Sequence, residues 1–223
     1  EFKRVDDDYL VSSNKYNSFK EESNNVRQNS FEQRINRVGS SQDARSGPGS
    51  NEKAYKHKLL TVMFTDIKDY SKKMNLDERS AIEMLEMHNR MLDSAIKNFN
   101  GIVIETIGDS FLASFESAAA AAECAVKIQR SFADYNTGKS PDEKIELRIS
   151  LHLGDVVQFG EGLKGDVINV AARIQELTSA GDIYISQSVY NTIKSKTHFL
   201  FQELGTYSIK NIREPVTLYK ILP

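Results

Sequence analysis

The feature that most constrains this chain is an apolar run, residues 59–65, which stops at a carboxylate, Asp66. The run reads LLTVMFT and is rich in β-branched and aromatic residues, which is typical of a buried strand. A second acid, Asp109, follows a glycine between two further apolar runs, residues 102–107 and 111–115. Strand ends and Gly-Asp turns favour aspartate for conformational reasons, so each acid alone is a weak functional signal.

The order of the expected elements predicts an α+β fold. A helix is expected over residues 76–98, with its N-cap at Asn75 and its end at Asn100 and Gly101. Later elements are a helix over 118–135, a strand over 145–152, a helix over 167–177, a strand over 182–186, a short helix over 189–195 and closing strands over 199–209 and 216–222. The order β-α-β-β-α-β predicts a ferredoxin-like sandwich with extra C-terminal strands and a helix.

Composition divides the chain into two parts. Residues 1–56 are rich in Asn, Ser and charged side chains, so we expect a polar, mostly disordered tail or linker before a folded domain over residues 57–223. The formal net charge of −2 does not favour nucleic acid as a partner.

Cysteine content and hydropathy indicate the compartment. The single cysteine, Cys124, allows no disulfide within one chain, so a reducing compartment is expected. The sequence contains no apolar run long enough to span a bilayer. We therefore expect a cytoplasmic protein, or the cytosolic domain of a larger membrane-attached or sensor-linked protein, with no membrane contact by this segment.

Three motifs occur in order at domain-scale spacing: FTDI at residues 64–67, IETIGD at 104–109 and GDVINVAAR at 165–173. Together with ISLHLG at 149–154 and IKNIREP at 209–215, they resemble the class III adenylate and guanylate cyclases. The resemblance implies an enzyme that converts a nucleoside triphosphate into a 3′,5′-cyclic nucleotide and pyrophosphate. It covers most of the chain after residue 58.

The resemblance also implies two divalent metal ions, Mg²⁺ or Mn²⁺, bound by Asp66, Asp109 and the backbone carbonyl of Ile67. Carboxylate oxygens are the hard donors that such ions prefer. One ion would lower the pKa of the ribose 3′-hydroxyl for attack on the α-phosphate, and the other would neutralise the departing pyrophosphate.

Three further residues match family positions. Asn169 matches the residue that orients the ribose, and Arg173, one helical turn later, matches the residue that stabilises charge on the α-phosphate in the transition state. Lys210 matches the lysine that binds the terminal phosphates. The resemblance further implies a homodimer in which the metal aspartates and the base-binding residues of one site come from different subunits.

The segment after the first aspartate departs from the family. Many members have Gly and Phe there, where backbone amides approach the phosphates, whereas this chain has Lys68, Asp69, Tyr70 and Ser71. Asp69 adds a negative charge and a Cβ to a candidate phosphate-binding loop, and Lys68 offsets that charge in part. Low basal activity is therefore expected.

Two positions predict the base. The adenylate cyclases have Lys at the position of Glu105 and Asp or Thr at that of Gly162. A carboxylate only accepts hydrogen bonds, so Glu105 can receive the N1–H and N2–H₂ donors of guanine but offers no donor to N1 of adenine. Gly162 removes the adenine-selecting side chain. The sequence therefore predicts a guanylate cyclase that forms cyclic GMP from GTP.

Other functions stay open at this point. They are an adenylate or dual-specificity cyclase that uses ATP, and an inactive nucleotide-binding regulatory module. The diguanylate cyclases share the fold, but this sequence lacks their Gly-Gly-Asp/Glu-Glu-Phe signature. An upstream sensor or regulatory domain is expected as a partner in each case.

Overall fold

The computed structural model describes residues 56–159, 162–209, 212 and 214–222. Of the expected tail, only Lys56 lies within these residues, and it begins the first strand. The strands are β1 (Lys56–Ile67), β2 (Ile102–Ile107), β3 (Ser110–Phe115), β4 (Leu147–Phe159), β5 (Gly162–Lys164), β6 (Ile183–Ser186), β7 (Leu200–Tyr207) and β8 (Val216–Leu222). The helices are α2 (Tyr70–Leu76), α3 (Glu78–Asn98), α4 (Ala118–Tyr135), α5 (Asp166–Leu177) and α6 (Gln187–Ile193).

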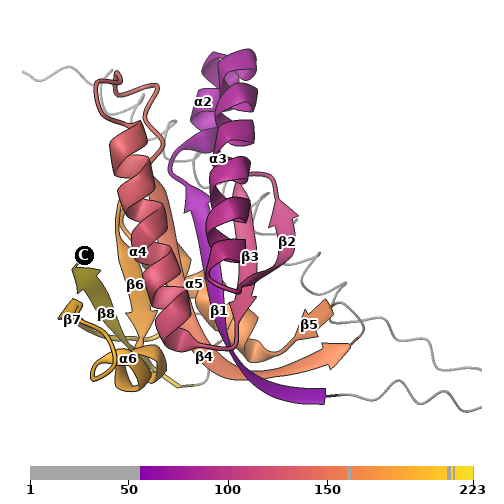
Figure 1. Ribbon diagram of the computed structural model, residues 1–223, viewed down its shortest axis with the longest axis vertical. Helices are drawn as coiled ribbons and strands as arrows, with labels where there is room; N and C mark the ends of the chain where they lie inside the picture. The colour runs from indigo at the N-terminus through magenta and orange to yellow at the C-terminus, as the bar shows by residue number, and fades with distance from the viewer. Residues whose placement is uncertain (1–55, 160–161, 210–211, 213, 223) are drawn as a thin grey trace, which may run out of the picture. The chain divides into compact units, whose positions relative to one another are not determined.

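The strands form a single sheet in the order β2-β3-β1-β4-β6-β8-β7, with β5 paired to β4 outside this path (Figure 1). The central strand β1 pairs antiparallel with both β3 and β4. Strand β4 pairs parallel with β6, and the chain between these two strands contains the helix α5. The predicted β-α-β-β-α-β order and its ferredoxin-like sheet are confirmed. None of the helices in the described ranges has the length and apolar character needed to cross a membrane.

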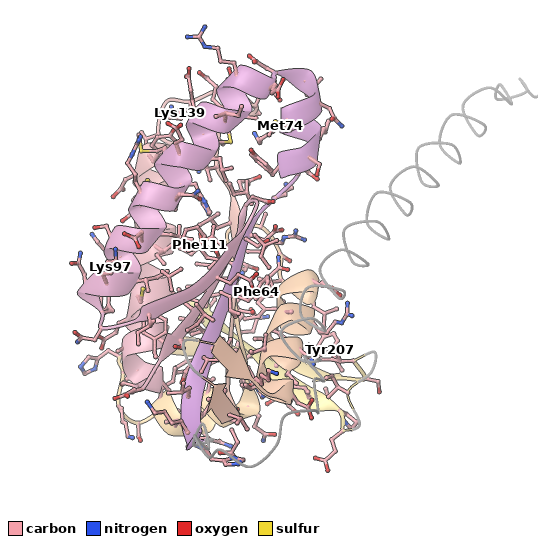
Figure 2. The ribbon with its side chains drawn as sticks, turned by 90° about the vertical axis from the view of Figure 1, so that its right-hand side faces the viewer. Phe64, Met74, Lys97, Phe111, Lys139 and Tyr207 are labelled. Atoms are coloured by element: carbon pink, nitrogen blue, oxygen red, sulfur yellow. The ribbon has the colours of Figure 1, made fainter. Side chains whose placement is uncertain are left out.

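Helices cover the two faces of the sheet differently. The main core lies under α3, α4 and α6 and includes Met63 and Ile67 of β1 with Phe111 of β3. Figure 2 shows the strands nearly edge-on, with α3 on one side and α5 on the other. Because side chains alternate along a strand, Phe64 and Asp66 lie on the face that carries α5.

The start of α3 corrects one prediction. The N-cap is Asp77, whose carboxylate accepts a hydrogen bond from the backbone N–H of Ser80 at 3.1 Å. The predicted cap, Asn75, belongs instead to α2, a short helix that the sequence did not reveal. Packing explains the difference, because Tyr70 of α2 is only 5% exposed and belongs to the main core.

Strand β4 and its continuation also differ from the prediction. The strand was expected to end at residue 152 but runs to Phe159, then returns as β5. Its additional length pairs with the first residues of β1, from Lys56 opposite Gln158 to Leu60 opposite Gly154. Strand pairing between distant segments, which a local pattern does not report, therefore extends both strands.

Candidate active site

Two chain segments far apart in sequence bring Asp66 and Asp109 together. Asp66 is the penultimate residue of β1, and Asp109 follows Gly108 in the turn between β2 and β3. Gly108 has φ +60, a left-handed conformation that favours glycine. The Asp109 carboxylate accepts a hydrogen bond from the backbone N–H of Ile67 at 3.2 Å, so it lies against the peptide unit that follows Asp66. Both acids are buried, at 9% and 5% exposure.

Three elements hold the carboxylate of Asp66. Its Oδ1 accepts a hydrogen bond from the Ser110 hydroxyl of β3 at 3.2 Å. Its Oδ2 forms an ion pair with the guanidinium of Arg148, the residue opposite it on β4. The same oxygen accepts a hydrogen bond from the side-chain amide of Gln175, on α5, at 3.3 Å.

Arg148 and Gln175 were not among the residues singled out from the sequence. One signal was available for Arg148, because alternation along the run 145–152 puts it on one face with Ser150 and His152. For Gln175 the only signal was a polar side chain on the buried side of a helix. Neither pattern by itself reports contact with an acid.

The donor set fits a metal ion that also binds phosphate. Among the described residues, no cluster of three or more His, Cys, Asp or Glu could hold a metal ion by itself. Mg²⁺ is usually bound through one or two carboxylates plus substrate phosphates and water, which matches Asp66 and Asp109. The Arg148 guanidinium, which pairs with Asp66, suits the oxygens of those phosphates. The side chain of Ile67 is buried in the main core, so only its backbone is offered to the site.

Helix α5 begins where only glycine fits. Gly165, its N-cap, has φ +152, and a Cβ at this position would lie 2.8 Å from the carbonyl oxygen of Asp155. This close approach sets α5 against β4. Asn169 is exposed on the helix, and the Arg173 guanidinium forms an ion pair with Glu176 at 2.7 Å.

Asn169 and Arg173 do not face the Asp66 of their own chain. Successive helical residues are rotated by about 100°, so Arg173 and Gln175 lie about 160° apart around the axis of α5. Gln175 contacts Asp66, and the sides of the helix bearing Asn169 and Arg173 therefore point elsewhere. Within a single chain, the structure therefore does not bring Asn169 and Arg173 together with the acids Asp66 and Asp109.

Glu105 lies on the same face of the sheet as Asp66. It stands opposite Leu112 of β3, which stands opposite Phe64 of β1, and directly paired residues share a face. Phe64 is two positions before Asp66, which completes the assignment. Glu105 is half-buried on the edge strand β2, just after a register shift in the pairing with β3.

The neighbours of both candidate base-binding residues, Glu105 and Gly162, line one cavity. The cavity has a volume of about 560 Å³, and its walls include Val103 and Ile104, just before Glu105, and Leu163, just after Gly162. Gly162 is the first residue of β5, opposite Phe159 of β4. The structure thus brings the two segments to the same cavity, although they are distant in sequence.

Of the candidate phosphate-binding residues, the structure describes the segment 68–71 but not Lys210. Lys68 forms an ion pair with Glu146 at 3.1 Å, and Asp69 has φ +56 at the start of α2. Because the ring of Tyr70 is buried in the core, that residue can offer a phosphate only its backbone; Ser71 is half-buried.

Fold and site together define a ferredoxin-like α+β domain with two buried acids, one near the end of β1 and one in the turn between β2 and β3. The chain belongs to the family of adenylate and guanylate cyclase catalytic domains, whose model matches residues 52–223. It is therefore a class III nucleotidyl cyclase domain, and members of this family generally use divalent metal ions.

Individual relatives agree with this assignment. A Rhizobium meliloti (strain 1021) protein named "Putative adenylate cyclase 3" is 31% identical over 77% of this chain and 30% of its own length. The adenylate/guanylate cyclase/hydrolase from Silicibacter pomeroyi has 30% identity and a TM-score of 0.69, over 75% of this chain and 98% of that one. The guanylate cyclase domain of RhGC from Catenaria anguillulae, solved with GTP, has 26% identity and a TM-score of 0.61 over the same shares. The chain spans less than a third of the length of the first curated relatives that it matches.

Proposed function

We propose that this domain is a guanylate cyclase that converts GTP into 3′,5′-cyclic GMP and pyrophosphate. The observation that carries the proposal is Glu105, a carboxylate on the same sheet face as Asp66 and next to the cavity that Leu163 also lines. Guanine offers adjacent N1–H and N2–H₂ donors to such an acceptor, whereas adenine offers an acceptor at N1. Binding ATP would leave the carboxylate facing another acceptor, and a polar group that loses water on binding without gaining a partner is costly.

The residues around Asp66 support the metal-dependent part of the proposal. Asp66, Asp109 and the carbonyl of Ile67 would hold two divalent ions, which when bound would lower the pKa of the ribose 3′-hydroxyl and neutralise charge on the departing pyrophosphate. Arg148 lies beside Asp66 and can bind phosphate oxygens with two parallel N–H donors. The backbone of residues 68–71 and Lys210 would bind the remaining phosphates.

The position of Asn169 and Arg173 supports a site shared by two chains. Both point away from the Asp66 of their own protomer, so in a homodimer they would serve the acids of the partner. Asn169 would orient the ribose, and the planar guanidinium of Arg173 would stabilise charge on the α-phosphate. Two equivalent sites follow from the two-fold symmetry of such a dimer.

An adenylate cyclase is the second candidate, because the Rhizobium relative named above carries that activity in its name. The test is to compare kcat/KM for GTP and ATP with Mn²⁺, in the wild-type chain and in the double variant Glu105→Lys, Gly162→Asp. We expect the wild type to prefer GTP and the double variant to lower the GTP/ATP ratio about 100-fold or more.

Glu123→Lys makes the same charge change as Glu105→Lys, but on the exposed side of α4, and should leave the ratio unchanged. A wild-type preference for ATP would establish the second candidate. Binding of either nucleotide without any product would establish an inactive nucleotide-binding module.

A further inference from the structure

Gln175 is the one polar side chain on the buried side of α5. The other buried residues of this helix are apolar: Val167, Ile168, Val170, Ala171, Ala172 and Ile174. Gln175 is 6% exposed, and its amide donates to Oδ2 of Asp66. A buried amide is costly unless it forms a hydrogen bond, and the contact with Asp66 supplies one.

The chemistry of this contact differs from that of the neighbouring ion pair. Arg148 brings a positive charge to the same oxygen and therefore competes with a metal cation for it. The amide of Gln175 is neutral, so it can orient the carboxylate without cancelling the charge that attracts the metal. The hydroxyl of Ser110 has the same property at Oδ1.

We propose that Gln175 is a positioning residue that holds the Asp66 carboxylate for the metal ions of its own protomer's site. The inference rests on the proposed function, in which Asp66 is a metal ligand and Arg173 serves the partner's site. Helix α5 would then contribute to both sites of the dimer, with Gln175 acting within its own chain and Arg173 acting across the interface.

The first test measures Mn²⁺ affinity by calorimetry in the full-length dimer, with 3′-deoxy-GTP present so that no reaction occurs. The variant Gln175→Met keeps the length of the side chain and removes the donor, and we expect about tenfold weaker Mn²⁺ binding. Gln175→Leu replaces it if the methionine variant does not fold.

Gln129→Met is the matched control. Gln129 also donates from its side-chain amide, but to the backbone carbonyls of Leu147 and Asp182, from α4 on the opposite face of the sheet from Asp66. The variant Gln129→Met should lower the melting temperature without changing Mn²⁺ affinity. Unchanged Mn²⁺ affinity in Gln175→Met, or an equal loss in both variants, would overturn the inference.

A second test separates the two chains of the dimer. A heterodimer of an Asp66→Ala chain and an Arg173→Ala chain keeps one complete site, whose acids come from the Arg173→Ala chain. Adding Gln175→Met to that chain should weaken Mn²⁺ binding about tenfold, whereas adding it to the Asp66→Ala chain should not. An equal loss of Mn²⁺ affinity whichever chain carries Gln175→Met would overturn the proposed role. If Asp66→Ala itself leaves Mn²⁺ binding intact in the homodimer, the proposed function fails instead.

Discussion

Asp69 occupies a backbone conformation that favours glycine. Its φ of +56 lies in the left-handed region, which aspartate tolerates better than most residues but at some cost. Its carbonyl accepts hydrogen bonds from the N–H groups of Lys72 and Lys73, and these bonds form the first turn of α2. The family resemblance places a glycine here, and the geometry gives a physical reason for that preference.

Replacing Asp69 should therefore improve nucleotide binding. Asp69→Gly removes a negative charge near the proposed phosphate site, and we expect the KM for Mn²⁺-GTP to fall by roughly fivefold, the equivalent of about 1 kcal/mol. Steady-state kinetics check this. Asp69→Asn removes the charge but keeps a side chain, so a similar gain assigns the effect to charge. No change in KM in either variant would show that this segment lies away from the phosphates.

At the scale of an element, α5 shows why one chain is insufficient in the proposed mechanism. Its buried side meets the sheet and Asp66, while Asn169 and Arg173 lie on other sides. Close packing at Gly165 sets the position of the helix against β4. A rotation that brought Arg173 to the Asp66 of the same chain would remove Gln175 from Asp66 and expose apolar residues that are now buried.

Mixing two inactive chains should therefore restore activity. Asp66→Ala and Arg173→Ala homodimers should each lose activity by at least about 100-fold. Their mixture should recover up to roughly a quarter of the wild-type rate, because half of the random dimers are heterodimers with one intact site. Cyclic nucleotide formation after co-refolding measures this. A mixture as inactive as its components would contradict the shared site.

At the scale of the whole molecule, the buried His88 and the half-buried His152 link stability to pH. Burial lowers the pKa of His88 to about 4, although the negative charge of Asp66 acts in the opposite direction. Burial also lowers the pKa of His152 to about 4. His88 packs edge-on against Phe111 beneath the sheet, and its side chain is fully buried. Both histidines are neutral in the folded protein at neutral pH.

Stability should fall as the pH drops through the interval from about 6.5 to 4. The unfolded chain binds protons at its histidines over this interval while the folded chain does not, so protonation favours unfolding. The cost for His88 is about 2 kcal/mol at pH 5. Urea unfolding of wild type and His88→Leu at pH 7 and pH 5 tests this, since other groups contribute equally to both. Between pH 7 and pH 5 the free energy of unfolding should fall by about 2 kcal/mol less in the variant than in the wild type. An equal fall in both proteins would contradict the role of His88.

Local patterns predicted most of the elements because their causes are local. The helix over 118–135 begins and ends as predicted, since it is rich in alanine and capped by Ser117, whose hydroxyl accepts from the N–H of Ala120 at 3.2 Å. Helix α2 and strand β5 were missed, because the burial of Tyr70 and pairing with β4 stabilise them. Two cap candidates, Asn75 and Asp77, lie within one turn, and packing decided between them.

The sequence by itself determined the order of the elements, the family and the candidate acids, because motifs and periodicity are properties of neighbouring residues. Only the tertiary structure decided that Arg148 and Gln175 meet Asp66, and that Glu105 shares its sheet face. Those contacts depend on strand register and on the rotation of α5 against the sheet. Both are set by packing between segments that are far apart in the chain, which no local pattern encodes.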